Sequence, residues 1–465
     1  MGKEKKKFRV PNVLIILFGL ILICSILSYI IPAGAYDMMD LNGRSVVDPN
    51  SYHQLDQTPV SLMQMLTSLT RGLQDVSSIV FFLFIVAGSL AVVQATGALE
   101  AGLGRMARKM SGRGWLLIPI ILGLFGLGGA TFGMCEEAAP FVPLFVALCI
   151  AMGFDSIVGT AIVMVGAASL GWAGEFMNPF CLQVAQGIAE LPALSGMGLR
   201  IALFVTLWVV TSIWIVRYAN KVKKDPKSSL VYDIDIQRDD SLDLDNLPEF
   251  DTRKKLVLVA FILMICLLIF GVIKYGWYMD EISALFLGGG IVCAIIGKMG
   301  FNRYAEVFGK GMSDITMGAL IVGISKAIVI VLNDGNIMHV FLHGAATILG
   351  AFPPAISAVG MYIFQNVLNL IVVSGSGQAA LTMPLMAPLA DLVGVTRQTA
   401  VMALSIGNGL SNVLTPVSGF LMAALALGKI PWEKWAKWML PLFGLQFLVG
   451  LVFIVIAQVT GYGPF

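Results

Sequence analysis

Charged side chains are scarce in this chain of 465 residues: Asp, Glu, Lys and Arg together make up only 12% of it. Soluble domains carry about 25% charged residues. Here hydrophobic residues reach 57%, and the mean hydropathy is +0.86. The formal net charge of +2 says nothing about nucleic acid, because the basic residues follow the membrane topology described below, and we expect no nucleic-acid partner. These scarcities exclude an ordinary soluble protein and predict a helical protein embedded in a lipid bilayer.

Patterns typical of enzymes and of cofactor sites are also missing. The sequence has no G-x-x-x-x-G-K-[ST] phosphate loop, no H-E-x-x-H zinc motif and no G-x-S-x-G nucleophile turn. Its six cysteines lack C-x-x-C spacing, which indicates small core residues rather than a disulfide or metal framework. His339 and His343 share one helical face, but two histidines do not make a metal site. We therefore expect no enzymatic activity, no cofactor and no resident metal ion.

Two adjacent carboxylates, Glu136 and Glu137, interrupt apolar runs of the kind found inside a bilayer. An ionisable group at that depth costs roughly 2.5–3.5 kcal/mol on insertion scales, so such residues usually mark a substrate or ion pathway. Either glutamate alone could instead satisfy the dipole of its own helix. The pattern around them occurs twice, because Glu137-Ala138-Ala139 and the later Gly153 match Gln378-Ala379-Ala380 and Gly394 at equal spacing. A carboxylate in one copy thus corresponds to an amide in the other.

The basic residues indicate how the chain crosses the membrane. Lysines and an arginine precede the first apolar segment, residues 10–31, which is long enough to span the bilayer as an uncleaved helix. Further basic clusters follow at 105–113 and 217–227. Because cytoplasmic loops carry an excess of Lys and Arg, we predict a cytoplasmic N-terminus, an external loop at 36–58 and an external C-terminus. The polar stretch 221–255 is predicted to be a solvated connector without a fold of its own.

Polar or glycine-rich tips interrupt two apolar regions, which predicts helical hairpins that enter the membrane and return. The first hairpin comprises residues 115–127, a glycine-rich break at 126–133, and residues 140–152. The second comprises residues 355–373, a tip at 374–378, and residues 379–392. Irregular backbone at membrane depth is tolerated only where it is buried in protein or lines water.

Two further spans are broken near their middles, at 174–179 and at 410–416, and interfacial helices are predicted at 61–72, 303–311 and 431–438. Hairpin and break recur in the same order in both halves but with opposite orientation. The sequence therefore predicts an all-α polytopic membrane protein of two inverted repeats, each with a re-entrant helical hairpin and a broken transmembrane helix. The predicted divisions are 1–217 for the first repeat, 218–254 for a cytoplasmic linker, 255–280 for a connecting transmembrane helix, and 281–465 for the second repeat.

Interrupted helices at corresponding places point to a binding site near the bilayer midplane. One half offers carboxylates, whereas the other offers amides, hydroxyls and helix N-termini that suit a substrate carboxylate. That asymmetry favours a zwitterion with an additional positive group over a dianion. The candidate substrate-binding residues are Glu136, Glu137, Glu175, Asn178, Ser374, Gly375, Ser376, Gly377, Gln378, Asn412, Thr415 and Pro416.

Two other ionisable residues have open roles at this point. Glu175 could contact the substrate, could be a structural carboxyl, or could be a coupling site for H⁺ or Na⁺. Lys326 lies inside the apolar segment 315–332. It could pair with Asp314 or Asp334 near the ends of that segment, or act as a fixed internal cation.

Several motifs resemble the YfcC family of the ion-transporter superfamily. They are Arg9-Val10-Pro11, Ile31-Pro32-Ala33-Gly34, Gly133-Met134-Cys135-Glu136-Glu137, Asn178-Pro179-Phe180 and Ala185-Gln186-Gly187-Ile188-Ala189. Relatives of that family include C4-dicarboxylate carriers and arginine–ornithine exchangers. The resemblance implies an elevator-type secondary carrier for a small molecule, homodimeric and in the plasma membrane. With the charge asymmetry, it leads us to expect arginine exchanged for ornithine. The alternative is uptake of a C4-dicarboxylate or other carboxylate coupled to Na⁺ or H⁺.

Overall fold

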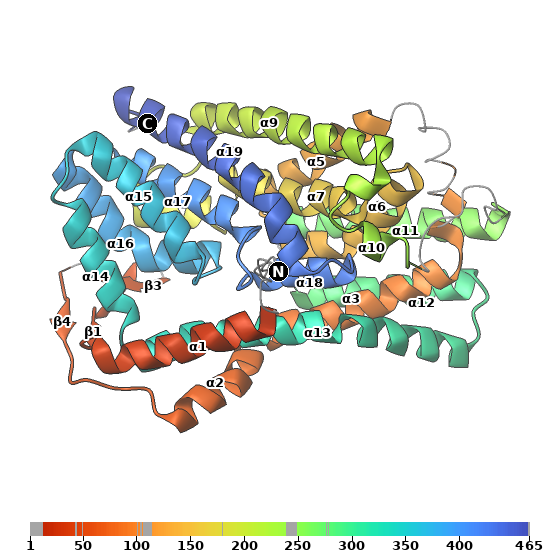
Figure 1. The fold of residues 1–465 in the computed structure, drawn as a ribbon, viewed down its shortest axis with the longest axis horizontal. Coiled ribbons are helices and arrows are strands. Elements are labelled where there is room, and N and C mark those ends of the chain that lie inside the picture. The colour runs from red at the N-terminus through yellow and green to blue at the C-terminus, as the bar shows by residue number, and fades with distance from the viewer. Residues whose placement is uncertain are drawn as a thin grey trace, which may run out of the picture.

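The computed structural model of the chain describes residues 13–463, apart from 42–43, 49, 100, 103–104, 106–113, 179, 239–248, 276 and 278. Helices dominate these residues (Figure 1), which confirms the predicted helical class. The N-terminal lysines, Pro179 and most of the basic cluster at 105–113 lie outside the described residues.

The first half of the chain contains helices of three kinds and four short strands. Strand β1 (Gly34–Ala35) pairs antiparallel with β4 (His53–Gln54), and β2 (Met38–Leu41) pairs antiparallel with β3 (Arg44–Val47). These strands fall within the predicted polar loop at 36–58 or next to it. The helices are α1 (Val13–Ile30), α2 (Leu62–Asp75), α3 (Ser77–Ala95), α5 (Gly114–Phe132), the 3-10 helix η1 (Glu136–Phe141), α6 (Val142–Ala151), α7 (Ser156–Met164), the π-helix η2 (Val165–Gly171), α8 (Leu182–Ile188), α9 (Met197–Lys224), the 3-10 helix η3 (Pro226–Ser228) and α10 (Tyr232–Asp235).

The described residues of the second half form helices and the segments that connect them, without a strand. Its helices are α11 (Thr252–Tyr275), α12 (Met279–Ile296), α13 (Phe301–Asp334), α14 (Met338–Leu349), α15 (Pro354–Asn369), α16 (Gly375–Val393), α17 (Arg397–Asn412), α18 (Gly419–Leu427) and α19 (Trp432–Val459). Both predicted interruptions of a span are present. One lies between η2 and α8 and the other between α17 and α18.

Among the described residues, α5, α9 and α19 are each long and apolar enough to cross a membrane. The number rises to as many as five if two bent pairs are counted as single spans. One pair is α2 with α3, bent by 55°, and the other is the two parts of α13, bent by 43° between Met317 and Ala319. The arms of the predicted hairpins other than α5, and the halves of the broken spans, are too short or too polar to pass this test.

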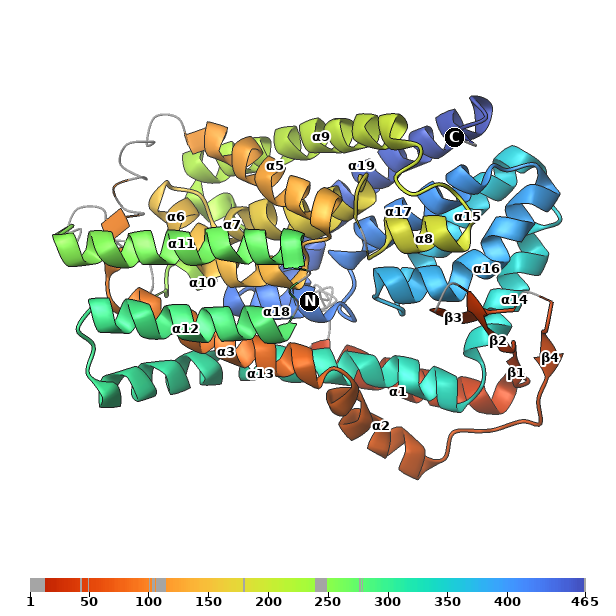
Figure 2. The ribbon, with the colours of Figure 1, turned by 180° about the vertical axis from the view of Figure 1, so that it is seen from behind.

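Two hydrophobic cores hold the helices together. The larger core contains the buried sides of α1, of α5 to α9 and of α14 to α19, with the C-terminal part of α13. The smaller core is formed by α3, α11, α12 and the middle of α13. Figures 1 and 2 show α3, α12 and α13 side by side along one edge of the molecule. Helix α13 takes part in both cores and therefore connects the two groups of helices.

The predicted glycine-rich break at 126–133 is wrong, because α5 continues as a helix to Phe132. Its glycines provide close packing instead. A Cβ added at Gly129 would lie 2.1 Å from the Ala167 carbonyl oxygen, and one at Gly126 would lie 2.7 Å from Cδ2 of Leu170. The break comes only at Gly133, whose φ of +77° favours glycine.

Two of the predicted interfacial helices belong to longer elements. Residues 303–311 lie in the first part of α13, which is bent by 43° from the part after Met317. Residues 431–438 are not a separate helix, because they begin α19, which runs on through Pro441 to Val459. A proline inside a helix removes one backbone hydrogen bond, but the remaining turns on both sides keep α19 continuous. Length and polarity could not distinguish a separate amphipathic helix from the first turns of a longer one.

The connector predicted to lack a fold is in part well packed. Residues 225–238, here called the strap, include η3 and α10. The Asp155 carboxylate accepts hydrogen bonds from Ser229 Oγ at 2.7 Å and Tyr218 Oη at 2.6 Å, and the Asp235 carboxylate accepts one from the Ser156 amide at 2.9 Å.

The strap also reaches the second half of the chain. Arg238 donates to the Gly428 carbonyl oxygen, and Asp233 forms an ion pair with Lys434. The hydrogen bond that the Lys434 ammonium donates to the Asp233 carboxylate holds the pKa of Asp233 below its ordinary value. The prediction of a connector without structure is therefore wrong for these residues, which touch α7, α9 and the junction of α18 with α19.

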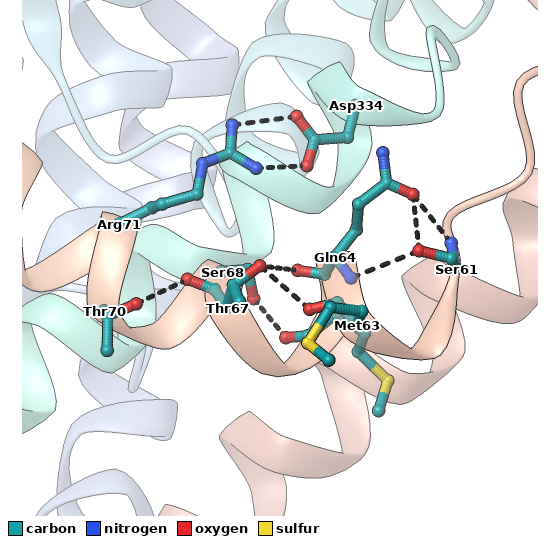
Figure 3. Close-up of polar contacts among 9 residues, drawn as sticks. Ser61, Met63, Gln64, Thr67, Ser68, Thr70, Arg71 and Asp334 are labelled. Atoms are coloured by element: carbon teal, nitrogen blue, oxygen red, sulfur yellow. Dashed lines mark hydrogen bonds and ion pairs between the residues drawn. The ribbon is translucent and has the colours of Figure 1, made fainter.

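Helix α2 packs antiparallel against the C-terminal part of α13. Ser61 begins α2 with a capping box, in which its Oγ accepts from the Gln64 amide at 3.2 Å (Figure 3). At the other end Arg71 binds Asp334 through two hydrogen bonds of 2.5 and 2.9 Å. The helices approach closely where a Cβ added at Gly72 would lie 2.4 Å from the Gly323 carbonyl oxygen.

Candidate functional site

A cavity of about 300 Å³ lies where the two predicted hairpins meet α13 and the start of α18. Its volume is at the lower end of the range for small-molecule sites, roughly 300–1,000 Å³. Among the described lining residues, Glu136 is the acidic side chain and Lys326 the basic one. The lining residues are Val76, Glu136, Lys326, Val329, Asn333, Met338, Ile371, Val372, Val373, Ser374, Gly377, Leu381, Val417, Gly419 and Phe420.

The two adjacent glutamates have different surroundings. Both belong to η1, and Glu136 lines the cavity. The Glu137 carboxylate instead accepts a hydrogen bond from the Cys135 amide at 3.0 Å, and its residue is only 6% exposed. Glu137 thus takes the helix-terminus role that was one of the alternatives for either residue. Glu136 is the acidic side chain that a solute in the cavity would meet.

The predicted tip at 374–378 is the first turn of a helix. Ser374 is the N-cap of α16, and its Oγ accepts a hydrogen bond from the Gly377 amide at 3.2 Å. Ser374 and Gly377 line the cavity. Gly375 faces the other way, because a Cβ there would lie 2.3 Å from Trp172 and 2.9 Å from Cys181. The positive end of the α16 dipole is therefore directed at the cavity.

Behind this turn lies a buried network of amide side chains. Gln378 donates to the Gln365 side-chain oxygen at 2.7 Å and accepts from Asn408 Nδ2 at 3.0 Å. Asn369 Nδ2 donates to the Asn412 side-chain oxygen at 2.8 Å. These hydrogen bonds join α15, α16 and α17 into one unit. Gln378 and Asn412, both candidates from the sequence, serve this network and are not among the residues that line the cavity.

Thr415 and Pro416 lie at the break between α17 and α18. Ser376, the other remaining candidate of the second half, is exposed in the first turn of α16 and is not among the residues that line the cavity. Thr415 Oγ1 donates to the carbonyl oxygen of Leu370 at 2.9 Å, so the break is connected to the C-terminal end of α15. Pro416 immediately precedes Val417, which lines the cavity. Sequence reasoning did not select Gln365, Asn369 or Asn408. Their amides inside otherwise apolar helices were the signal that could have identified them.

Glu175 and Asn178 lie in a second, fully buried polar cluster at the break after η2. Ser405, Cys181 and Asn178 surround the Glu175 carboxylate, and Arg200 is the nearby cation. Neither Glu175 oxygen makes a hydrogen bond of normal geometry to a described residue. Arg200 is 1% exposed and donates to Ser405 Oγ at 3.2 Å. Arg200 was missed in the sequence, although an arginine at the start of an apolar span is itself a signal.

Lys326 pairs with neither of its predicted partners. Its Nζ lies 2.9 Å from Oδ2 of Asp75, the last residue of α2, whereas Asp334 binds Arg71. The sequence could not indicate this pairing, because it depends on how α2 packs across α13.

His339 and His343 contact aromatic and backbone groups. Nδ1 of His339 accepts from the Tyr36 amide at 3.1 Å, and the His343 ring stacks on Tyr52 with the centroids 3.8 Å apart. No group of three or more metal-ligating side chains is found in the described part of the chain.

The family model that matches this chain is described as "DcuC: C4-dicarboxylate anaerobic carrier" and covers residues 10–459. The chain belongs to the DcuC family. This DcuC family member is 35% identical to YfcC of Escherichia coli K12, named as a candidate basic amino acid antiporter, over 99% of both chains. It is 28% identical, again over 99% of both chains, to an uncharacterised protein of Haemophilus influenzae. The predicted resemblance is confirmed, and the chain is a transporter of the DcuC/YfcC type.

Two solved transporter structures are similar to the DcuC family chain at lower identity. The YdaH transporter of Alcanivorax borkumensis is 14% identical, with a TM-score of 0.45, over 98% of this chain and 100% of its own. MtrF of Neisseria gonorrhoeae, described as one of a class of antimetabolite efflux pumps, is 16% identical, with a TM-score of 0.46, over 97% and 96%.

Proposed function

We propose that the protein is a secondary carrier that exchanges basic amino acids, arginine for ornithine, across the plasma membrane. The observation that carries this proposal is the pair of opposite charges in one cavity. Glu136 offers a carboxylate to a cationic side chain, while Lys326 and the first turn of α16 offer positive charge to a carboxylate. The name of the relative YfcC agrees with this substrate class.

The charged side chains of the cavity favour an amino acid over a dianion as the substrate. A C4-dicarboxylate would place one carboxylate near Lys326, but the other would lie in a small cavity that also holds Glu136. Like charges a few ångströms apart in a partly desolvated site repel by several kcal/mol. An amino acid with a cationic side chain has complementary charges at both ends. The cavity volume of about 300 Å³ suits a metabolite of that size.

Counterflow in proteoliposomes tests the proposed substrate. Vesicles loaded with ornithine are expected to accumulate labelled arginine transiently, in a saturable manner, and empty vesicles are not. Saturation and counterflow separate a carrier from a channel. Vesicles loaded with succinate serve as the control. Exchange of labelled succinate, together with no movement of arginine, would contradict the amino-acid assignment.

The second candidate function is uptake of a C4-dicarboxylate, which the description of the DcuC family favours. Lys326 and the α16 first turn would then bind the two carboxylates, and a protonated Glu136 would remove the repulsion. Such uptake would be coupled to Na⁺ or H⁺, with Glu175 as the buried carboxylate able to carry a proton. Succinate uptake driven by an imposed Na⁺ or pH gradient would support this function.

An elevator mechanism with two inverted repeats is the motion that we propose. The helices α3, α11 and α12 share a core of their own with the middle of α13, as expected for a static scaffold. The amide network and the breaks belong to the larger core and would move with the substrate. A cross-link between cysteines introduced at Asn333 of α13 and Ser374 at the cap of α16, both of which line the cavity, is expected to stop counterflow. Normal transport by the cross-linked protein would contradict the elevator.

The proposed assembly is a homodimer with a cytoplasmic N-terminus and an external C-terminus. In this orientation the strap faces the cytoplasm and the loop with β1 to β4 faces outward. Thiol labelling of cysteines placed at the exposed positions His53 and Lys227 would then occur from opposite sides. The molar mass of the purified protein–detergent complex by light scattering tests the dimer.

A further inference from the structure

Two ion pairs connect α2 to α13, and they differ in what surrounds them. One pair joins Arg71 to Asp334, and the other joins Asp75 to Lys326. Because the two helices are antiparallel, the partners on α13 come in the reverse order of those on α2. Only the second pair reaches the cavity, because Lys326 is among the lining residues and Arg71 and Asp334 are not. The first pair is bidentate and, with the close approach of Gly72 to Gly323, joins α2 to α13 away from the cavity.

The Asp75–Lys326 pair is the weaker of the two in geometry. Lys326 Nζ makes one contact of 2.9 Å with a single oxygen of Asp75, and the two side chains are 37% and 51% exposed. Partly exposed ion pairs with one contact are worth little, typically up to about 1 kcal/mol. A second carboxylate that enters the cavity can therefore compete for the ammonium at small cost.

The positive groups around the cavity converge from two elements. Lys326 comes from α13, whereas Ser374 and Gly377 belong to the cap and first turn of α16. A carboxylate between them would receive a full positive charge from one side and the helix dipole from the other. Glu136 lines the same cavity and would meet a cationic group at the other end of the molecule.

We propose that Lys326 binds the carboxylate of the transported solute, and that Asp75 takes the place of this carboxylate in the empty protein. Asp75 is thus a built-in competitor of the substrate. When no solute is bound, the negative charge of Asp75 balances the positive charge of Lys326. The substrate class follows the proposed function, an amino acid with a cationic side chain, but the carboxylate subsite itself would serve any carboxylate solute of suitable size.

The test compares arginine with agmatine, which has the same guanidinium but lacks the carboxylate. Dissociation constants are measured by calorimetry on the full-length purified protein and on Lys326→Gln, Asp75→Asn and the double variant. Asp334→Asn is the matched control, because it removes the neighbouring ion pair between the same two helices without changing the cavity lining. Thermal unfolding of each variant reports whether it is folded.

Lys326→Gln is expected to lower the affinity for arginine about 10- to 100-fold, as for loss of a charge-assisted hydrogen bond. The affinity for agmatine should not fall. Asp75→Asn is expected to raise the affinity for arginine several-fold, because a Lys326 without its partner attracts the carboxylate. The affinity for agmatine should fall, because the same ammonium repels a pure cation. The double variant should behave like Lys326→Gln, and Asp334→Asn should keep the wild-type ratio of the two constants.

A wild-type ratio of arginine to agmatine affinity in folded Lys326→Gln would overturn the proposal. The proposal would also fail if Asp334→Asn changed that ratio as much as Lys326→Gln does. Lys326 would then act only by holding α2 against α13. Should Lys326→Gln not fold, an unchanged ratio in Asp75→Asn overturns the proposal. If the wild-type protein binds succinate and not arginine, the proposed amino-acid function fails. The carboxylate subsite is then decided with succinate, whose affinity Lys326→Gln must lower.

Discussion

Glu136→Gln is expected to weaken arginine binding by about 100-fold. The substitution keeps the size and hydrogen-bonding capacity of the side chain but removes the negative charge from the cavity. Loss of one partner of a hydrogen-bonded charge pair costs roughly 2–5 kcal/mol when the pair is desolvated. Because Glu136 is only partly buried, the lower part of that range applies, and each 1.4 kcal/mol corresponds to about tenfold in affinity.

Citrulline, the neutral analogue of arginine, makes this measurement specific. Its affinity should change little in Glu136→Gln, so the preference for the cation should disappear. Glu137→Gln is the matched control, since the Glu137 carboxylate accepts from the Cys135 amide and does not line the cavity. It should lower thermal stability and keep the preference for arginine. If Glu137→Gln abolishes that preference and Glu136→Gln does not, the roles of the two residues are reversed.

Arg200→Met is expected to destabilise the folded protein by about 3 kcal/mol, the lower end of the cost of leaving one buried charge without its counter-charge, because Arg200 and Glu175 are not hydrogen-bonded to each other. Arg200 is the cation beside Glu175, and both residues are buried. Methionine preserves much of the volume of the arginine side chain, so the loss is mainly electrostatic. The carboxylate of Glu175, which already lacks hydrogen bonds of normal geometry, would be left without a compensating charge.

The double variant Arg200→Met/Glu175→Gln shows whether charge is the cause. Removing both charges should restore most of the stability lost in Arg200→Met, as judged by thermal unfolding of the purified protein. Glu175→Gln alone is the second arm of the cycle. If the double variant is no more stable than Arg200→Met, the effect of Arg200 comes from packing and from its hydrogen bond to Ser405.

Local signals in the sequence predicted the helix interruptions well, because a break requires particular residues at the break itself. Asn178-Pro179 and Thr415-Pro416 each combine proline with a polar side chain that can bind free backbone groups. Glycine is less informative. The glycines of α5 resemble a helix break in the sequence, yet the same lack of a Cβ allows Gly126 and Gly129 to pack against η2.

The sequence predicted where in the chain the site lies better than it predicted which side chains line the cavity. Adjacent residues of a 3-10 helix point about 120° apart, so the sequence alone could not show which of Glu136 and Glu137 faces the cavity. The partner of Lys326 was equally hidden, because Asp75 reaches it only through the packing of α2 on α13. Candidate residues were identified by their chemistry, whereas their directions depended on tertiary contacts.

The strap has a practical consequence for work on this protein. Insertions are tolerated where the backbone is exposed and makes few hydrogen bonds, and residues 225–238 do not meet that condition. Val231 is fully buried, and Asp235 holds the start of α7 through the Ser156 amide. A fluorescent reporter or affinity tag inserted between Ser229 and Arg238 would pull the strap from α7 and from Gly428. A fusion made after Arg238 leaves every one of these contacts in place.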